Sequence, residues 1–96
     1  MSKRQYFVYI LTNYTNNVLY TGITNDLKVR IYSHKNKIGA DFTTKYNVNK
    51  LVYYEIFENP GNAIRREKAI KNLVRRKKID LIDKFNSKWE DLYHSL

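Results

Sequence analysis

The chain has 96 residues, about the length of one domain, which excludes an enzyme built from several large domains. Its 43% hydrophobic content excludes a disordered chain, and the absence of cysteine excludes disulfides, thiolate zinc sites and cysteine nucleophiles. Lys and Arg number 18 against 9 Asp and Glu, so the formal net charge is +9 at pH 7 and favours a polyanionic partner, nucleic acid first.

The longest wholly apolar run is far shorter than the ~20 residues needed to cross a bilayer, and we identify no signal peptide. We therefore expect a single domain over residues 1–96, with a core at about 6–80. The expected location is the cytoplasm, with association with the nucleoid as the alternative. We expect no membrane partner, and a monomer or a weak homodimer.

The first third of the chain predicts a hairpin and a helix. Residues 6–12 and 18–21 are apolar and β-branched runs joined by an Asn-rich turn, and Gly22 is expected to end the second strand. A helix is predicted to follow over about 24–36, with Thr24 as its N-cap. Its inward face has the spacing i, i+3, i+4, i+7: Leu27, Arg30, Ile31 and His34.

The rest of the chain predicts one more strand and three more helices. The polar stretch 37–50 is expected to be an ordered, exposed loop, and residues 51–57 alternate as a third strand. An Asn-Pro-Gly-Asn turn leads into a helix over 63–74, for which we expect Asn62 to be the cap.

A further helix is predicted over 77–85, burying Ile79, Ile82 and Phe85, and a Ser-Lys-Trp-Glu capping box predicts a last helix at about 88–95. The order strand, strand, helix, strand, helix, helix, helix predicts an α+β fold. It consists of a small three-stranded antiparallel sheet flanked by helices.

Glu67 is the first candidate for chemistry. Its neighbours one helical turn away are Ala63, Ile64 and Ile70, so its carboxylate is rooted beside the buried stripe of its helix. A partly buried carboxylate in a basic protein suits a hard divalent cation, Mg²⁺ or Mn²⁺. The alternative is an ordinary i, i+4 ion pair with Lys71.

Arg30 and His34 lie one turn apart on a face that should pack against the core. An Arg on such a face needs an anionic partner, which a phosphate can supply by bidentate contact. The alternative is a helix pair between Asp26 and Arg30, with His34 at the rim of the core. His94 is expected to be a surface residue.

Tyr9 and Tyr20 lie close together if the hairpin pairs in register. Aromatic packing across strands is one interpretation. The other is a tyrosine that accepts a proton, for which nearby cations must lower its pKa from about 10.

A basic segment from residue 65 to 78 holds eight Lys or Arg against one acid. Such a run often forms a solvated face, but here it borders Glu67 and can follow a phosphate backbone. The residues expected to bind nucleic acid are Lys28, Arg65, Arg66, Lys71, Arg75, Arg76 and Lys78.

Together these positions resemble the GIY-YIG nuclease family. The two signature triplets match residues 7–9 and 20–22, with ten residues between Tyr9 and Tyr20. The Arg of the family's helix falls on Arg30 and its metal-binding Glu on Glu67, all in the right order over about residues 6–80. The length and the phrase Arg-Arg-Glu-Lys-Ala-Ile-Lys resemble the small stand-alone bacterial branch.

The resemblance implies a metal-dependent endonuclease acting on DNA, for which we expect a role in repair or recombination, with RNA as the alternative substrate. Glu67 would hold one Mg²⁺ or Mn²⁺ ion, Tyr9 would be the base with Tyr20 orienting or sharing the proton, and the reverse assignment stays open. Arg30 would stabilise charge on phosphorus with help from His34, and Gly22 would let the backbone pass close to the site.

Two positions depart from the family pattern. The Gly that opens the first triplet is Phe7 here, and the Asn that many relatives place after the metal-binding Glu has no clear counterpart. These departures leave open a second function, a non-catalytic module that binds nucleic acid with the same fold and basic groove.

Overall fold

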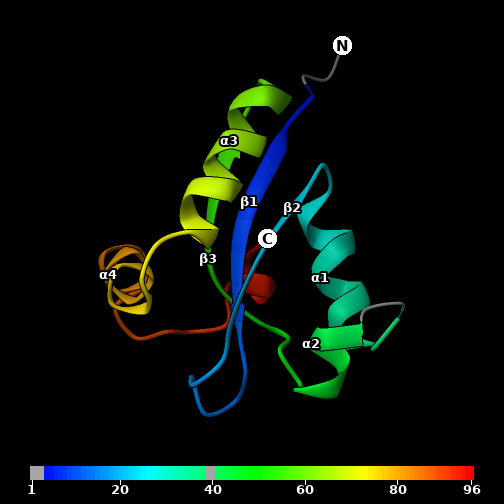
Figure 1. Ribbon diagram of the computed structural model, residues 1–96. Coiled ribbons are helices and arrows are strands. Elements are labelled where there is room, and N and C mark those ends of the chain that lie inside the picture. Colours follow the sequence, from blue (N-terminus) through cyan, green and yellow to red (C-terminus); the bar gives the residue numbers. More distant parts are fainter. Residues whose placement is uncertain (1–3, 39–40) are drawn as a thin grey trace.

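Three antiparallel strands form the centre of the computed structural model, which describes residues 4–38 and 41–96 (Figure 1). β1 (Tyr6–Thr12) lies between β2 (Leu19–Thr24) and β3 (Lys50–Phe57). Residues 8–12 of β1 are all buried, because a central strand is covered on both faces and paired on both edges. The predicted bounds of this strand are confirmed.

Helices cover both faces of the sheet. In Figure 1, α3 (Pro60–Lys71) and α4 (Arg75–Phe85) lie on one side, and α1 (Leu27–Lys35) and α2 (Asp41–Lys45) lie on the other. The predicted α+β class with a three-stranded antiparallel sheet is confirmed. None of the helices in the described residues is both long and apolar enough to cross a membrane.

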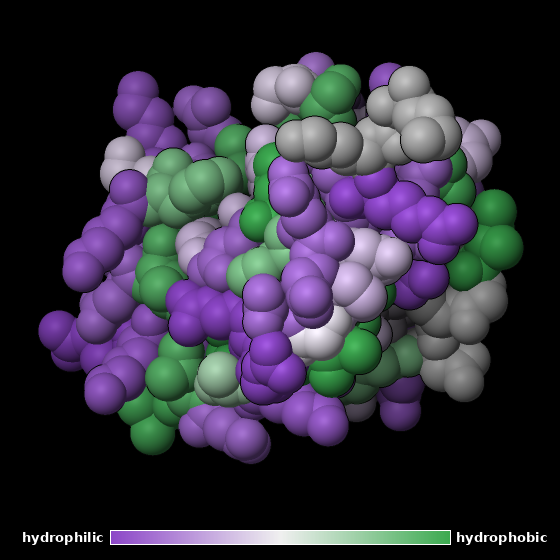
Figure 2. Space-filling model, turned by 90° about the horizontal axis from the view of Figure 1, so that it is seen from above, coloured by the Kyte–Doolittle hydropathy of each residue, from purple (hydrophilic) through white to green (hydrophobic). Residues whose placement is uncertain are grey.

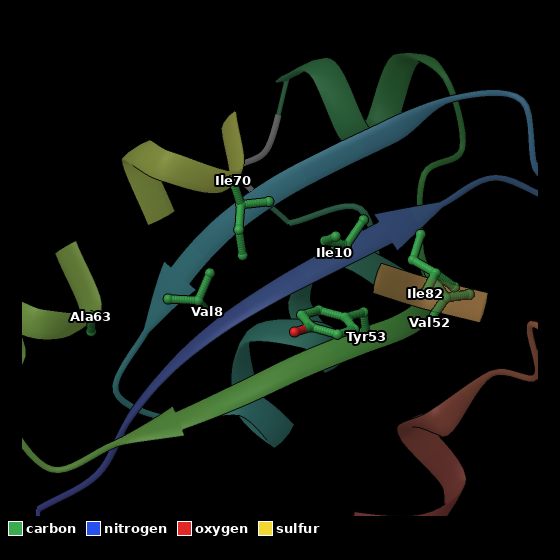
Figure 3. Packing of buried hydrophobic residues seen from close by; sticks show 7 residues of the cluster. All are labelled: Val8, Ile10, Val52, Tyr53, Ala63, Ile70 and Ile82. Atoms are coloured by element: carbon green, nitrogen blue, oxygen red, sulfur yellow. The ribbon is translucent and has the colours of Figure 1, made fainter. Parts of the chain in front are cut away.

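Side chains alternate between the two faces, so β1 contributes to two separate cores. The core under α3 and α4 is shown in Figure 3: Val8, Ile10, Val52, Tyr53, Ala63, Ile70 and Ile82. The core on the opposite face, under α1, is formed by Tyr9, Leu11, Leu27, Ile31, Val48 and Leu51. The candidate catalytic residues of β1 and β2 belong to this second face.

The junction between β2 and α1 differs from the prediction. β2 continues through Gly22 to Thr24, because Gly22 pairs with Tyr9 in the strand ladder. The N-cap is Asp26, whose carboxylate accepts from the Val29 N–H at 3.2 Å, while the Thr24 hydroxyl accepts from the Asp26 N–H. The predicted strand end and the Thr24 cap are therefore wrong.

The stretch 37–50 is not simply an exposed loop. It contains α2, whose Thr43 is only 2% exposed, and Val48 lies in the core. The Val48 N–H donates to the Thr43 carbonyl at 2.8 Å and ties the end of the segment to the helix. A helix of five residues is too short to show a periodic pattern, which is why the sequence did not reveal it.

The start of α3 is also shifted. Pro60 occupies the first turn and Asn59 is the cap, with its side chain accepting from the Asn62 N–H at 3.1 Å. The predicted Asn62 cap is wrong because Pro, which lacks an N–H, fits the first helical position. In α4, Ile82 is buried and Ile79 half-buried, whereas Phe85 is exposed and packs edge-on against Tyr53.

The predicted last helix is replaced by a short 3-10 helix, η1 (Leu92–Ser95). Asn86 donates to the Val52 and Glu90 carbonyls and accepts from the Glu90 N–H, and Trp89 has a positive φ of 53°. These bonds hold residues 86–90 in a turn against β3, so the predicted capping box does not form.

Candidate active site

Gly22 and Tyr9 define the centre of the site. They face each other across β2 and β1, and the phenol ring of Tyr9 lies directly over Gly22. A Cβ added at Gly22 would lie 2.4 Å from the Tyr9 hydroxyl and 2.5 Å from Cζ. Because β2 is an edge strand, the missing side chain lets the phenol reach from the central strand toward the edge of the sheet.

His34 on α1 contacts both tyrosines. Its Nε2 is 3.3 Å from the Tyr9 hydroxyl, and its Nδ1 is 2.9 Å from the Thr43 hydroxyl. The ring of Tyr20 meets the imidazole edge-on, with 5.9 Å between centroids. Tyr20 lies diagonally across the ladder from Tyr9, opposite Leu11, so the two phenols converge on one imidazole.

The surroundings of Tyr9 and His34 favour the neutral form of both side chains. Burial raises the pKa of Tyr9 to about 12, helped by Tyr20 and the charge of Glu67 and opposed by the charge and hydrogen bonding of Arg30. Burial and the Arg30 charge lower the pKa of His34 below 6.5, so its imidazole is neutral at pH 7. Burial therefore outweighs the nearby cation at Tyr9.

Arg30 takes part in the site without being buried. The predicted inward face of its helix is buried at three positions, whereas Arg30 itself is exposed. Its guanidinium nevertheless acts on the pKa of both Tyr9 and His34. An exposed cation beside these two groups is free to contact an incoming phosphate.

Glu67 approaches from α3, which packs against β1 and β2 on the other face of the sheet. Its side chain is 14% exposed, and its carboxylate forms an ion pair with the Lys71 ammonium at 3.1 Å. The same carboxylate is close enough to influence the pKa of Tyr9. The structure thus brings one residue of α3 to the group formed by β1, β2 and α1.

Glu67 is a sparse donor set for a metal. Among the described residues, no group of three or more His, Cys, Asp or Glu lies close enough to hold an ion. Mg²⁺ commonly keeps several waters and binds one or two carboxylates together with substrate phosphates. A single carboxylate fits an ion completed by water and a phosphate, and it does not fit a closed zinc or calcium site.

The basic residues expected to bind nucleic acid are not all equivalent. Arg66 forms a two-pronged ion pair with Glu55, with contacts of 2.9 Å, so its charge is already engaged. The others are exposed or half-exposed: Lys28, Arg65, Lys71, Arg75, Arg76 and Lys78. In Figure 2 the side of the molecule on which α3 and α4 lie in Figure 1 is covered largely by hydrophilic residues.

A groove of about 830 Å³ lies away from this group. It is lined by the first residues of β1, the start of α1 and the C-terminal residues, including Phe7, Leu27 and Tyr54. None of the candidate catalytic residues lines it. The candidate catalytic residues therefore lie outside this groove.

Thr43 is a candidate positioning residue that sequence reasoning missed. It is buried, and its hydroxyl is bonded to Nδ1 of His34, which holds the ring with Nε2 toward Tyr9. Its position in a polar stretch with no periodicity offered no signal before the fold was known.

Replacing Thr43 by Val is expected to lower the free energy of unfolding by about 1–2 kcal/mol, because a buried hydrogen bond is lost. We also expect the nitrogen chemical shifts of the His34 ring to change, because Nδ1 loses its partner. Thr44→Val is the matched control, since its buried hydroxyl has no partner among the described residues. Equal effects of the two variants would contradict the assignment.

Comparison with known proteins places this geometry in a family. The model of the GIY-YIG catalytic domain matches residues 5–80. A UPF0213 protein of Clostridium perfringens is 45% identical over 85 residues, covering 88% of this chain and 90% of that protein. The solution NMR structure of a UPF0213 protein from Bacillus halodurans is 33% identical, with a TM-score of 0.58 and coverage of 91% and 92%.

Proposed function

The chain belongs to the GIY-YIG catalytic-domain family, and on that premise we propose that it is a divalent-metal-dependent endonuclease that hydrolyses phosphodiester bonds in DNA, in repair or recombination. The observation that carries the proposal is the convergence of Tyr9, His34 and Arg30 with Glu67, which come from three separate elements. Two phenols and an exposed guanidinium lie beside one imidazole, and a carboxylate is close enough to act on the pKa of Tyr9; a structural role alone does not require this set of groups.

Tyr9 is our choice for the base that takes a proton from the attacking water. At pH 7 only about one phenol in 10⁵ is ionised when its pKa is about 12. A resting phenolate is therefore not the base. Instead, the Tyr9 hydroxyl can pass its own proton to neutral His34 as it accepts one from water, because the two groups are 3.3 Å apart.

Arg30 and Glu67 would help to stabilise the negative charge that develops on the phosphate during the reaction. Arg30, exposed beside the phenol, would bind the phosphate and stabilise the charge that develops on its oxygens. Glu67 would hold one Mg²⁺ or Mn²⁺ ion, which supplies charge stabilisation at a phosphate oxygen and at the leaving 3′ oxygen. Lys71 pairs with Glu67 in the protein alone and would shift toward the DNA backbone.

DNA binding would use the exposed cations of α1, α3 and α4. Only backbone contacts are expected from Lys and Arg side chains on such open surfaces, so recognition would depend on DNA structure more than on base sequence. Arg66 is a weaker candidate for this role than the more exposed cations, because its guanidinium forms an ion pair with Glu55.

The direct test is plasmid nicking by the purified protein with Mg²⁺, with Mn²⁺ and with EDTA. We expect relaxed and linear products with either metal and none with EDTA. Duplex, branched and single-stranded oligonucleotides, as DNA and as RNA, would then be compared at one salt concentration. Binding without cleavage on every substrate would replace the proposal by a non-catalytic module that binds nucleic acid.

The pH dependence of cleavage provides a further expected result. Burial and the Arg30 charge lower the pKa of His34 below 6.5. We therefore expect the rate to fall as pH decreases through this lowered pKa, because a protonated imidazole can no longer accept a proton. The free energy of unfolding changes in the same direction, because the unfolded chain takes up the proton at a higher pH than the folded protein does. The stability that neutral His34 contributes is fully present above pH 6.5 and is lost as pH falls through the folded-state pKa.

The check is a pH–rate profile of the wild type beside His34→Gln. The variant should retain a reduced rate without the acidic step. If both proteins show the same step, the titrating group is not His34 and the proton path through it is wrong.

A further inference from the structure

α2 and the turn that follows it present two aromatic rings to solvent beside the candidate site, Phe42 in the helix and Tyr46 just after it. Phe42 is 46% exposed and Tyr46 is 45% exposed. The Phe42 ring stacks on Tyr20, with 6.1 Å between centroids and 24° between the planes, and Tyr46 continues the series at 4.9 Å from Phe42. Three aromatic rings therefore lie in a series that starts at Tyr20 and continues over α2 to the turn after it.

The segment that carries these rings is held in place by buried contacts. Thr43, between them in sequence, is buried and bonded to His34, and Val48 just after the helix lies in the core. Figure 1 shows α2 beside α1, the helix that carries His34 and Arg30. The rings consequently have a fixed position relative to the residues that would act on the phosphate.

The two rings lie on the opposite side of this segment from the residues that pack inward. The core needs Thr43 and Val48 from this segment, whereas Phe42 and Tyr46 lie on the side that faces solvent. Large exposed apolar groups that lie together mark a binding surface. Their ligand is expected to carry negative charge as well, because the Lys45 ammonium lies 5.4 Å from the centre of the Tyr46 ring.

Aromatic faces accompanied by cations bind single-stranded nucleic acid, since each unpaired base has a free face for stacking and each phosphate a negative charge. A base inside an intact duplex has no free face. We propose that Phe42 and Tyr46 form a stacking surface for an unpaired nucleobase next to the bond that is cut, so that the substrate is single-stranded or contains an unpaired segment. This inference rests on the proposed function, whose site it extends.

Binding in EDTA tests the inference without cleavage. Fluorescence anisotropy would give the affinities of the wild type, Phe42→Leu and Tyr46→Leu for single-stranded DNA, single-stranded RNA and duplex DNA. We expect the Leu variants to bind single strands about 5- to 100-fold more weakly and duplex less than twofold more weakly. Phe42→Trp, which keeps a ring, should retain the affinity.

The control is Tyr14→Leu, which removes an aromatic ring that is 92% exposed in the hairpin turn. It should not change affinity for any substrate. Thermal unfolding of each variant shows whether the fold is kept, and Tyr46→Leu serves if Phe42→Leu does not fold. Quenching of 2-aminopurine placed in the strand gives a second readout, because stacking on a protein ring changes its fluorescence.

Equal losses on single strands and duplex, or no loss on either, would overturn the stacking surface. The failure of the endonuclease proposal would look different, with ring-dependent binding of single strands but no product in Mg²⁺ or Mn²⁺. The relative affinities for single-stranded DNA and RNA show whether the ligand carries deoxyribose or ribose.

Discussion

Glu67→Gln is expected to abolish metal-dependent cleavage while leaving DNA affinity unchanged or slightly higher. The amide has nearly the same size as the carboxylate, but it carries no charge for a divalent cation. The loss of several kcal/mol of charge stabilisation corresponds to a rate about a thousandfold lower or more. Affinity should not fall, because a negative charge is removed from the side of the protein that would meet phosphates.

The same substitution has little reason to unfold the protein. Glu67 pairs with Lys71, which is about half exposed, and such i, i+4 pairs contribute only about 0.3–0.5 kcal/mol. Cleavage by single-turnover kinetics, binding by anisotropy and stability by urea unfolding would be measured on one preparation. Glu90→Gln is the matched control, because it makes the same change at an exposed residue outside the site.

Metal binding can be followed independently of cleavage. Mn²⁺ broadens the NMR signals of nearby residues, and we expect broadening in α3 of the wild type when DNA is present and much less in Glu67→Gln. A single carboxylate paired with a lysine predicts weak binding without DNA. If Glu67→Gln cleaves at the wild-type rate, Glu67 is a structural residue with an ordinary helical ion pair.

Elements whose sequence pattern reflects their local structure could be predicted well. β1 is covered on both faces, so its seven residues form an unbroken apolar and β-branched run with clear ends. The third strand was predicted within one residue for the same reason, since it too has several buried positions. The candidate catalytic residues were identifiable because a resemblance supplied their order, which periodicity alone does not.

Features that depend on contacts between distant segments could not be predicted. Asn86 holds the C-terminal turn by bonding to Val52, a residue 34 positions away, and this outweighs the local capping pattern. Thr43 becomes important only because α2 folds against His34. Arg66 looked like a phosphate ligand in a basic run, and only the packing of α3 on β3 brings Glu55 to it.

The electrostatics of the site also required the structure. A tyrosine that acts as a base needs nearby cations to lower its pKa, but burial at Tyr9 has the larger effect and raises the pKa to about 12. That result changes the mechanism from a resting phenolate to a proton relay through His34. The relay also requires the Tyr9 phenol to reach across the edge strand. This reach is possible because Gly22 has no side chain.

Gly22→Ala is expected to disrupt the site and to destabilise the fold. The added methyl group would lie 2.4 Å from the hydroxyl of the fully buried Tyr9, closer than real Cβ atoms come to their neighbours, so the ring or the backbone must shift. Overpacking of this kind costs about 1–3 kcal/mol in free energy of unfolding. A shift of the hydroxyl by about 1 Å would lower the cleavage rate about a hundredfold in addition.

Gly61→Ala is the comparison, because its Cβ would make a tight contact of 3.1 Å with a side-chain oxygen of Asn59, which a shift of a few tenths of an ångström would relieve, and because Ala is favoured in a helix. The steric cause is tested by repeating Gly22→Ala in a Tyr9→Leu background, which removes the ring atoms that the methyl group meets. Urea unfolding should then show a much smaller cost for the second substitution, because the two effects are coupled through one contact. An unchanged cost would mean that Gly22 is required for the backbone of β2 itself, and the phenol would owe its position to His34 and Arg30 alone.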